Sequence, residues 1–172
     1  METFQPGEHV VHPLQGIGTV KETRQTTVLG ERVEVYVIET TKGMEIMIPV
    51  EKVRDVGIRK IVSGDDVEKI LKILRSPTRE EPFTAAEGWY ERYETLKNRM
   101  RTGTAETLAE IVRDLSKNAK VYELNVKEHE ILKSARDLLV QEITLAGGIS
   151  KTKAAERIDD SLKANVRKKV AS

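Results

Sequence analysis

Residues 32–39 read RVEVYVIE, a run in which β-branched side chains alternate with others. Successive side chains of a strand point to opposite faces, so one face receives Val33, Val35 and Val37. The opposite face receives Glu34, Tyr36 and Ile38. This alternation predicts a β-strand rather than a helix.

Similar stretches lie on both sides of this run, and the β-like pattern ends at about Ile61. They read HVV, IGTVKETRQTTV and MEIMIPV, and glycine- or proline-containing turn signals separate them. Pro49 ends the last of them and indicates a sheet edge or corner, because proline has no N–H for a central strand. About four or five strands this short bury enough surface only by curling, so we expect a small barrel.

From Ser63 onward the hydrophobic period becomes that of a helix. Two runs carry apolar residues at i, i+3, i+4 and i+7, namely Val67, Ile70, Leu71, Leu74 and Leu108, Ile111, Val112, Leu115. The first follows the capping signal Ser63–Asp66, and the second follows Thr104. Pro77 to Gly88 interrupts the pattern and is predicted to be a loop or a broken helix.

Two further helices are expected towards the C-terminus. Asn125 with Glu128 forms a capping box ahead of a helix that ends at Gly147–Gly148. Ser150 can cap a last helix reaching about Val170, in a tail with seven basic and three acidic residues from 149 to 172. The sequence thus predicts a two-domain α+β protein, with a β-barrel over residues 1–62 and a compact all-α domain of about five helices over residues 63–172.

Composition limits the classes of function. The 172 residues carry a formal net charge of +1 and contain no cysteine, which excludes disulfides and thiolate chemistry. No apolar run approaches the roughly 20 residues of a membrane span. We therefore expect a cytoplasmic protein without a membrane partner.

Signs of catalysis are missing. The three histidines His9, His12 and His129 have no metal-ligand spacing, and the Gly16–Gly18 pair lacks the third glycine of a dinucleotide loop. Most carboxylates alternate with Lys and Arg at helical spacing, as on solvated faces. We expect no enzymatic activity, no metal and no cofactor, and instead a binding protein.

The motifs FQPGEHVVHPLQGIGTV, MEIMIPVEKVRDVGIRKI, LRSPTREEP, W-YERY and AEIVRDL closely resemble the CarD/CdnL family of bacterial transcription regulators. The resemblance runs in one order from Phe4 to about Ala146. The front module also resembles that of the transcription-repair coupling factor, but helicase motifs are absent. The resemblance implies a Tudor-like (SH3-like) antiparallel barrel that binds the β subunit of RNA polymerase, and a helical domain that contacts promoter DNA without reading its sequence.

In this family a tryptophan at the start of a helix wedges at the upstream edge of the transcription bubble, and Trp89 occupies that position. The only tryptophan of the chain would then stack where a base pair is lost and stabilise the open complex. The resemblance assigns further DNA-side positions to Arg92, Tyr93, Lys97, Arg99, Arg101 and Val126. Each position also has a structural alternative. Trp89 could be a packing anchor, Tyr93 its packing support, and Arg92 an ion-pair partner of Glu87 or Glu91. Lys97, Arg99 and Arg101 could form a solvated face, and Val126 could be a helix staple.

The resemblance also implies polymerase-docking positions, which are Thr26, Val37, Met47 and Pro49. Relatives carry docking arginines where this chain has Thr26 and Met47, so docking is expected to depend on strand-edge pairing and apolar contact. Val37 and Met47 could instead belong to the barrel core. The insert FTAAEG before Trp89 and the acids Glu91 and Glu94 also depart from the family pattern. A monomer is expected, and the alternative function is a protein-interaction adaptor that does not touch DNA.

Overall fold

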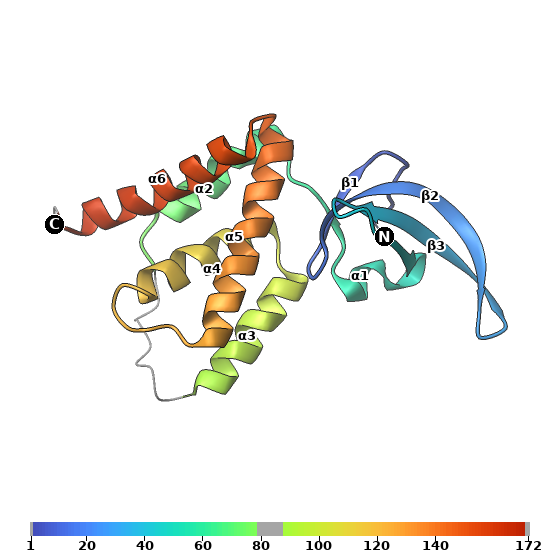
Figure 1. The fold of residues 1–172 in the computed structure, drawn as a ribbon, viewed down its shortest axis with the longest axis horizontal. Coiled ribbons are helices and arrows are strands. Elements are labelled where there is room, and N and C mark those ends of the chain that lie inside the picture. Colours follow the sequence, from blue (N-terminus) through green and yellow to red (C-terminus); the bar gives the residue numbers. More distant parts are fainter. Residues whose placement is uncertain (1, 79–87, 171–172) are drawn as a thin grey trace. The chain divides into compact units, whose positions relative to one another are not determined.

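The computed structural model describes residues 2–78 and 88–170, and only the backbone of residues 166–170. Most of the insert before Trp89, residues 83–87, lies outside the described residues. The chain divides into two compact units, residues 1–61 and 62–172 (Figure 1). The first is a sheet and the second is helical, so the expected two-domain α+β class is confirmed.

The first unit is an antiparallel sheet in the order β4-β3-β2-β1-β5. Its strands are β1 (His9–His12), β2 (Gly16–Val28), β3 (Glu31–Thr40), β4 (Glu45–Pro49) and β5 (Arg59–Lys60). The predicted strand at residues 32–39 is therefore the body of β3, between β2 and β4. Pro49 is the last residue of β4, an edge strand, as its missing N–H suggested.

The expected closure into a barrel is wrong for the described residues, because β4 and β5 are the two ends of an open sheet. A short helical segment covers one sheet face instead, formed by η1 (Val50–Lys52) and α1 (Val53–Val56). Its Val53 packs in one apolar cluster with Phe4, Tyr36 and Ile38. This cover removes apolar surface from water without a strand pair between β4 and β5.

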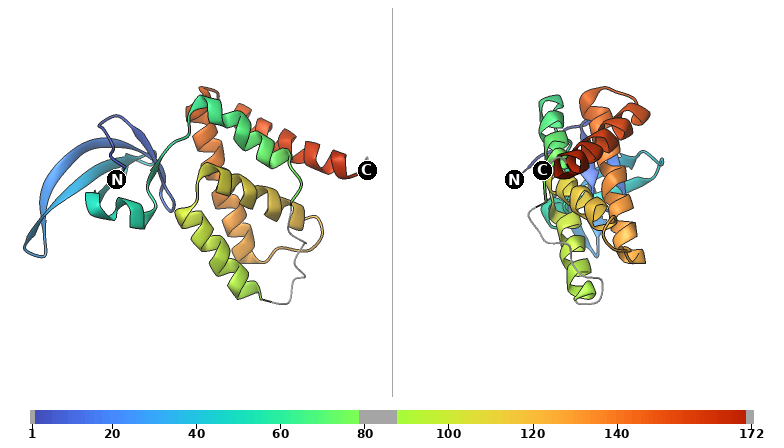
Figure 2. Two further views of the ribbon diagram at one scale, coloured as in Figure 1. Left: turned by 180° about the vertical axis from the view of Figure 1, so that it is seen from behind. Right: turned by 90° about the vertical axis from the view of Figure 1, so that its left-hand side faces the viewer.

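The second unit contains a short η2 (Gly64–Asp66) and, in the described residues, five helices, which confirms the expected number. They are α2 (Val67–Arg75), α3 (Trp89–Thr102), α4 (Ala105–Asn118), α5 (Val126–Gly147) and α6 (Lys151–Val170). Figures 1 and 2 show α2 and α6 running side by side across one end of α5. No described helix combines the length and apolar character that crossing a lipid bilayer demands.

Local signals set the helix boundaries where the sequence predicted them. Thr104 Oγ1 accepts a hydrogen bond from the N–H of Thr107 at 3.3 Å and begins α4. Asn125 and Glu128 form the reciprocal capping box of α5, at 2.9 and 3.0 Å. Ser150 Oγ accepts the N–H of Lys153 at 3.1 Å and begins α6. Each cap satisfies an N–H group that the first helical turn leaves unpaired.

The core of the helical unit consists of the apolar stripes of four helices. All eight residues of the two predicted i, i+3, i+4, i+7 runs on α2 and α4 are buried, and so are Ile131, Leu139 and Ile143 on α5 and Ile158 on α6. Glu142 is fully buried among them, and its Oε1 accepts the N–H of Val62 at 2.9 Å. This bond holds the first residue of the unit against α5.

Candidate functional site

Trp89 is the first residue of α3, and its side chain is 48% exposed. Gly88 ahead of it has a φ of +67°, a left-handed conformation that glycine adopts without steric cost. The neighbouring Tyr90 is 60% exposed, and the two rings meet edge to face with centroids 5.8 Å apart. The rings of Trp89 and Tyr90 thus face solvent at the N-terminal end of α3.

The first turn of α5 lies at the same end of the helical unit. Figures 1 and 2 show the starts of α3 and α5 at one end. The ammonium group of Lys127 lies 5.9 Å from the ring centroid of Tyr93, and Lys97 approaches the same ring at 5.9 Å. Val126, the first residue of α5, is exposed. The fold therefore gathers Trp89, Tyr93, Lys97 and Val126.

Arg92 points into the unit rather than into solvent. Its Nη2 lies 3.6 Å from Oε1 of Glu128, and the two side chains are only 10% and 4% exposed. The expected alternative was an ion pair with Glu87 or Glu91; Glu87 lies outside the described residues, and the observed acid is Glu128 on α5. Burial and the Glu128 carboxylate raise the pKa of the nearby Tyr122, and Arg92 opposes them.

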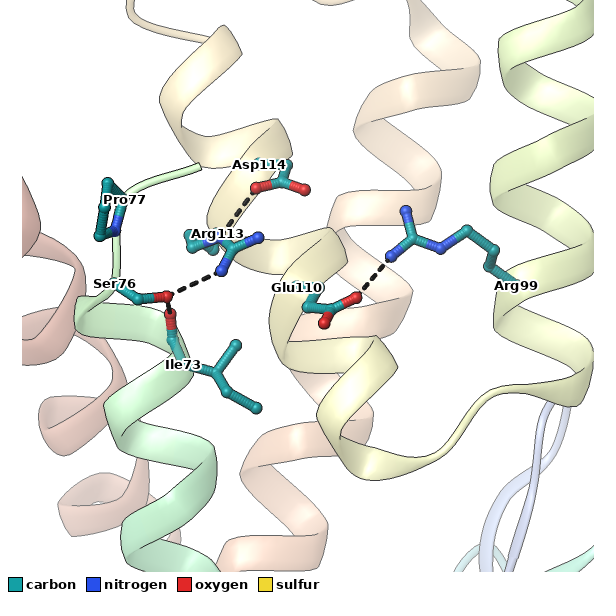
Figure 3. A pocket seen from close by; sticks show the side chains of 7 residues that line it. All are labelled: Ile73, Ser76, Pro77, Arg99, Glu110, Arg113 and Asp114. Carbon is teal, nitrogen blue, oxygen red and sulfur yellow. Dashed lines mark hydrogen bonds and ion pairs between the residues drawn. The ribbon is translucent and has the colours of Figure 1, made fainter. Parts of the chain in front are cut away.

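Arg99 is also directed at a neighbouring helix. Its Nη2 donates to Oε2 of Glu110 on α4 at 2.9 Å (Figure 3). The two side chains line a hollow between α2, α3 and α4 that Arg113 enters from α4. Arg113 donates to Ser76 Oγ at 2.8 Å and to Asp114 Oδ1 at 2.8 Å. These arginines therefore link helices, and their charges are neutralised by neighbouring acids.

The remaining basic residues of α3 are available to solvent. Lys97 and Arg101 are exposed on the helix surface. Glu91 is exposed and Glu94 is partly exposed in the first half of α3, where they would repel a phosphate. The cationic character of this surface is thus modest, and the exposed rings dominate it.

The four residues expected at the polymerase-docking surface share one face of the sheet. Val37 pairs with Met47 across β3 and β4, and Val35 pairs with Pro49. Thr26 pairs with Val33 on the same face, because alternate residues of β3 point the same way. Met47 is 49% exposed, whereas Val37 is 1% exposed, so only part of this set can touch a partner directly.

Three residues of the site were not assigned a DNA-side position from the sequence. Tyr90 is exposed beside Trp89, and its adjacency in the sequence could have indicated it. Glu128 was predicted as a capping residue, but its second role beside Arg92 depends on the packing of α3 against α5. Lys127 had no local signal at all. Among residues 2–78 and 88–170, no cluster of acids and histidines is arranged to hold a metal ion.

Comparison with known proteins agrees with both units. Residues 4–62 match the family described as "CarD-like/TRCF RID domain", and residues 69–159 match "CarD, C-terminal domain". A Bacillus subtilis (strain 168) protein named "Putative transcription factor YdeB" is 28% identical over 148 residues, which cover 86% of this chain and 94% of that protein. The second family match alone spans more than half of the chain. The chain belongs to the CarD family of transcription regulators.

Proposed function

We propose that this protein binds the β subunit of RNA polymerase through residues 1–62 and stabilises the open promoter complex through Trp89. The match of residues 4–62 to the CarD-like/TRCF RID domain supports the first part. The match of residues 69–159 to the CarD C-terminal domain supports the second. The protein acts by binding alone, without a catalytic step.

The observation that carries the proposal is the exposure of Trp89. A tryptophan that serves only as a packing anchor is normally largely buried, because its ring is the largest apolar side chain. Trp89 instead leaves 48% of its surface in solvent, next to the exposed Tyr90 and at the same end as Val126. A flat ring presented in this way can stack on a base at the junction of duplex and single strand.

Stacking of one base on an aromatic ring contributes on the order of 1–3 kcal/mol. The contact exists only when the strands have parted, so it favours the open complex over the closed one. A contribution of about 1.4 kcal/mol shifts this equilibrium tenfold, whereas equal binding to both states would shift nothing.

Phosphate contact is expected from the exposed Lys97, Arg101 and Lys127 rather than from Arg92 and Arg99, which are more enclosed. Lys127 Nζ also lies 3.6 Å from Oε2 of Glu130 on its own helix. Lysine and arginine contacts to phosphates do not read bases and weaken as salt rises. Glu91 and Glu94 lower the affinity of this end for free DNA. DNA contact therefore depends on docking to polymerase, which raises the local concentration of the helical unit at the promoter.

Docking is expected on the sheet face that carries Thr26, Met47 and Pro49, with the buried Val37 beside Met47 on the neighbouring strand. β4 is an edge strand of the described sheet, so its outer backbone groups can pair with a strand of the partner. Met47→Glu places a charge in this apolar contact and should weaken polymerase binding. The exposed position of Met47 lets the variant fold normally.

Trp89→Ala tests the mechanism. The lifetime of the open complex formed with polymerase should fall by roughly fivefold to 150-fold, which corresponds to the stacking energy. Leu145→Ala is the matched control, since Leu145 is an exposed apolar residue near the other end of α5. Polymerase binding and thermal unfolding are measured for both variants. An unchanged lifetime with Trp89→Ala, at normal binding and folding, would favour the adaptor that does not touch DNA.

A further inference from the structure

We propose that the buried Arg92–Glu128 ion pair positions Trp89, by tying the first turn of α3 to the first turn of α5. The functional consequence rests on the proposed role of Trp89 at the fork. The structural part concerns only how the ring is held, and it can be tested in the free protein.

α3 has no apolar anchor of the kind that holds the other long helices. None of its apolar residues, over residues 89–102, is buried, although each of α2, α4 and α5 buries several. A helix with so little buried apolar surface gains little orientation from the hydrophobic effect. Polar contacts must therefore contribute much of what fixes its direction.

The Arg92–Glu128 pair acts at the turn that carries Trp89. Arg92 is three residues after Trp89, one helical turn along, and its N–H donates to the carbonyl of Gly88 at 3.0 Å. The guanidinium lies 3.6 Å from Glu128, and both side chains are almost fully enclosed. An ion pair shielded from water is screened weakly by salt, so it constrains geometry more than a surface pair does.

Glu128 is itself held in place. Its Oε2 accepts the N–H of Asn125 at 3.0 Å, and its own N–H donates to Oδ1 of Asn125 at 2.9 Å. Its other oxygen, Oε1, faces Arg92. One carboxylate therefore caps α5 and holds α3, and it connects the turn that presents Val126 with the turn that presents Trp89.

This arrangement allows a selective substitution. Glu128→Gln keeps an oxygen that can accept the N–H of Asn125, so the cap can survive, but it removes the charge that Arg92 faces. Arg92→Met removes the charge from the other side with a side chain of similar reach. Arg92→Lys retains the charge and should restore part of the effect. Arg99→Met is the matched control, because it breaks a different ion pair of α3, with Glu110 on α4.

Trp89 reports on its own position, because it is the only tryptophan in the chain. Quenching of its fluorescence by acrylamide and its time-resolved anisotropy are measured in the full chain. In Glu128→Gln and Arg92→Met the quenching constant should rise about twofold and fast depolarisation should increase, because the first turn of α3 becomes locally mobile. Arg99→Met should leave both signals unchanged.

Unchanged Trp89 signals in Glu128→Gln and Arg92→Met overturn the proposal, and so does an equal change in Arg99→Met. Circular dichroism identifies a variant that fails to fold. In that case the folded one of Glu128→Gln and Arg92→Met decides: a raised quenching constant supports the positioning role, and the parent Trp89 signal overturns it.

Open-complex lifetime then separates this proposal from the proposed function. A lifetime shortened by Glu128→Gln, with no further loss when Trp89→Ala is added, supports both. Greater mobility of Trp89 with no change of lifetime in Glu128→Gln or in Trp89→Ala supports the positioning role and overturns the wedge. In a third outcome Trp89→Ala shortens the lifetime, but Glu128→Gln does not, although its Trp89 is mobile. This outcome supports the wedge and shows that the Arg92–Glu128 pair is not needed for it.

Discussion

α3 and α4 are consecutive helices of 14 residues each, and the same unit holds them in different ways. α4 buries six apolar residues, including Leu108, Ile111 and Leu115, whereas α3 buries no apolar residue over residues 89–102. Ion pairs to α5 and α4, through Arg92 and Arg99, connect α3 to its neighbours instead.

The two helices therefore have different roles: α4 builds the core, and α3 presents aromatic side chains to solvent. The apolar residues of α4 pack in the core, so its exposed face is polar. α3 directs Trp89 and Tyr90 to solvent and contacts the unit largely through polar groups. In a transcription regulator of the CarD family, such a helix can offer aromatic surface to a partner without unfolding the core.

The largest expected effect tests α4 as the core helix of the two. Ile111 on α4 is fully buried, whereas Leu96 on α3 is half-buried. Ile111→Ala leaves a cavity and should lower the free energy of unfolding by about 2–5 kcal/mol. Leu96→Ala should cost less than about 1.5 kcal/mol, because water already reaches part of that side chain. Chemical denaturation followed by helical circular dichroism measures both, and equal losses would contradict the comparison.

The next effect concerns Gly103, which separates the two helices. A Cβ added there would overlap the carbonyl oxygen of Arg99 and come within 2.8 Å of the Thr107 side chain. Gly103→Ala should therefore destabilise the unit by about 1–3 kcal/mol, since the backbone must shift to admit it. Gly147→Ala is the control, because its Cβ would meet only ordinary contacts with Ile149. A thermal midpoint for Gly103→Ala that matches the control would show that the α3–α4 connection adapts freely.

A smaller effect comes from the different starts of the two helices. Thr104 caps α4 through its side chain, whereas Gly88 ahead of α3 has none to offer. Thr104→Ala leaves the N–H of Thr107 without this acceptor and should lower the free energy of unfolding by about 1 kcal/mol. Thr104→Ser retains the hydroxyl and should restore most of it. Urea denaturation of the pair measures the difference, and no loss with Ala would mean that water replaces the cap.

The smallest effect concerns the partly exposed Arg99–Glu110 ion pair between α3 and α4. The Arg99 and Glu110 side chains are 30% and 44% exposed, so Arg99→Ala should cost at most about 1 kcal/mol. The loss should shrink further at high salt, because exposed charges are screened. Glu128→Gln, at the buried pair, should show little such salt dependence. Unfolding measured at low and high salt checks this, and a salt-independent loss for Arg99→Ala would contradict the assignment.

Most of the architecture could be predicted because it depends on neighbours in the chain. The alternation at Val33, Val35 and Val37 identified β3, and the box of Asn125 and Glu128 identified the start of α5. Closure of the sheet could not be predicted, since it depends on whether β5 reaches β4 or a helix covers the face instead. The partner of Arg92 could not be predicted either, because Glu128 lies on a helix that is distant in the sequence.

The sequence alone determined the order of strands and helices, their caps and the identity of the single tryptophan that follows Gly88. Periodicity and capping act between residues at most a few positions apart, so they can be read from the chain. The tertiary structure decided which charges of α3 are enclosed, which rings remain in solvent and which sheet face carries Met47. Those properties depend on contacts between segments far apart in sequence, which arise only when the units pack.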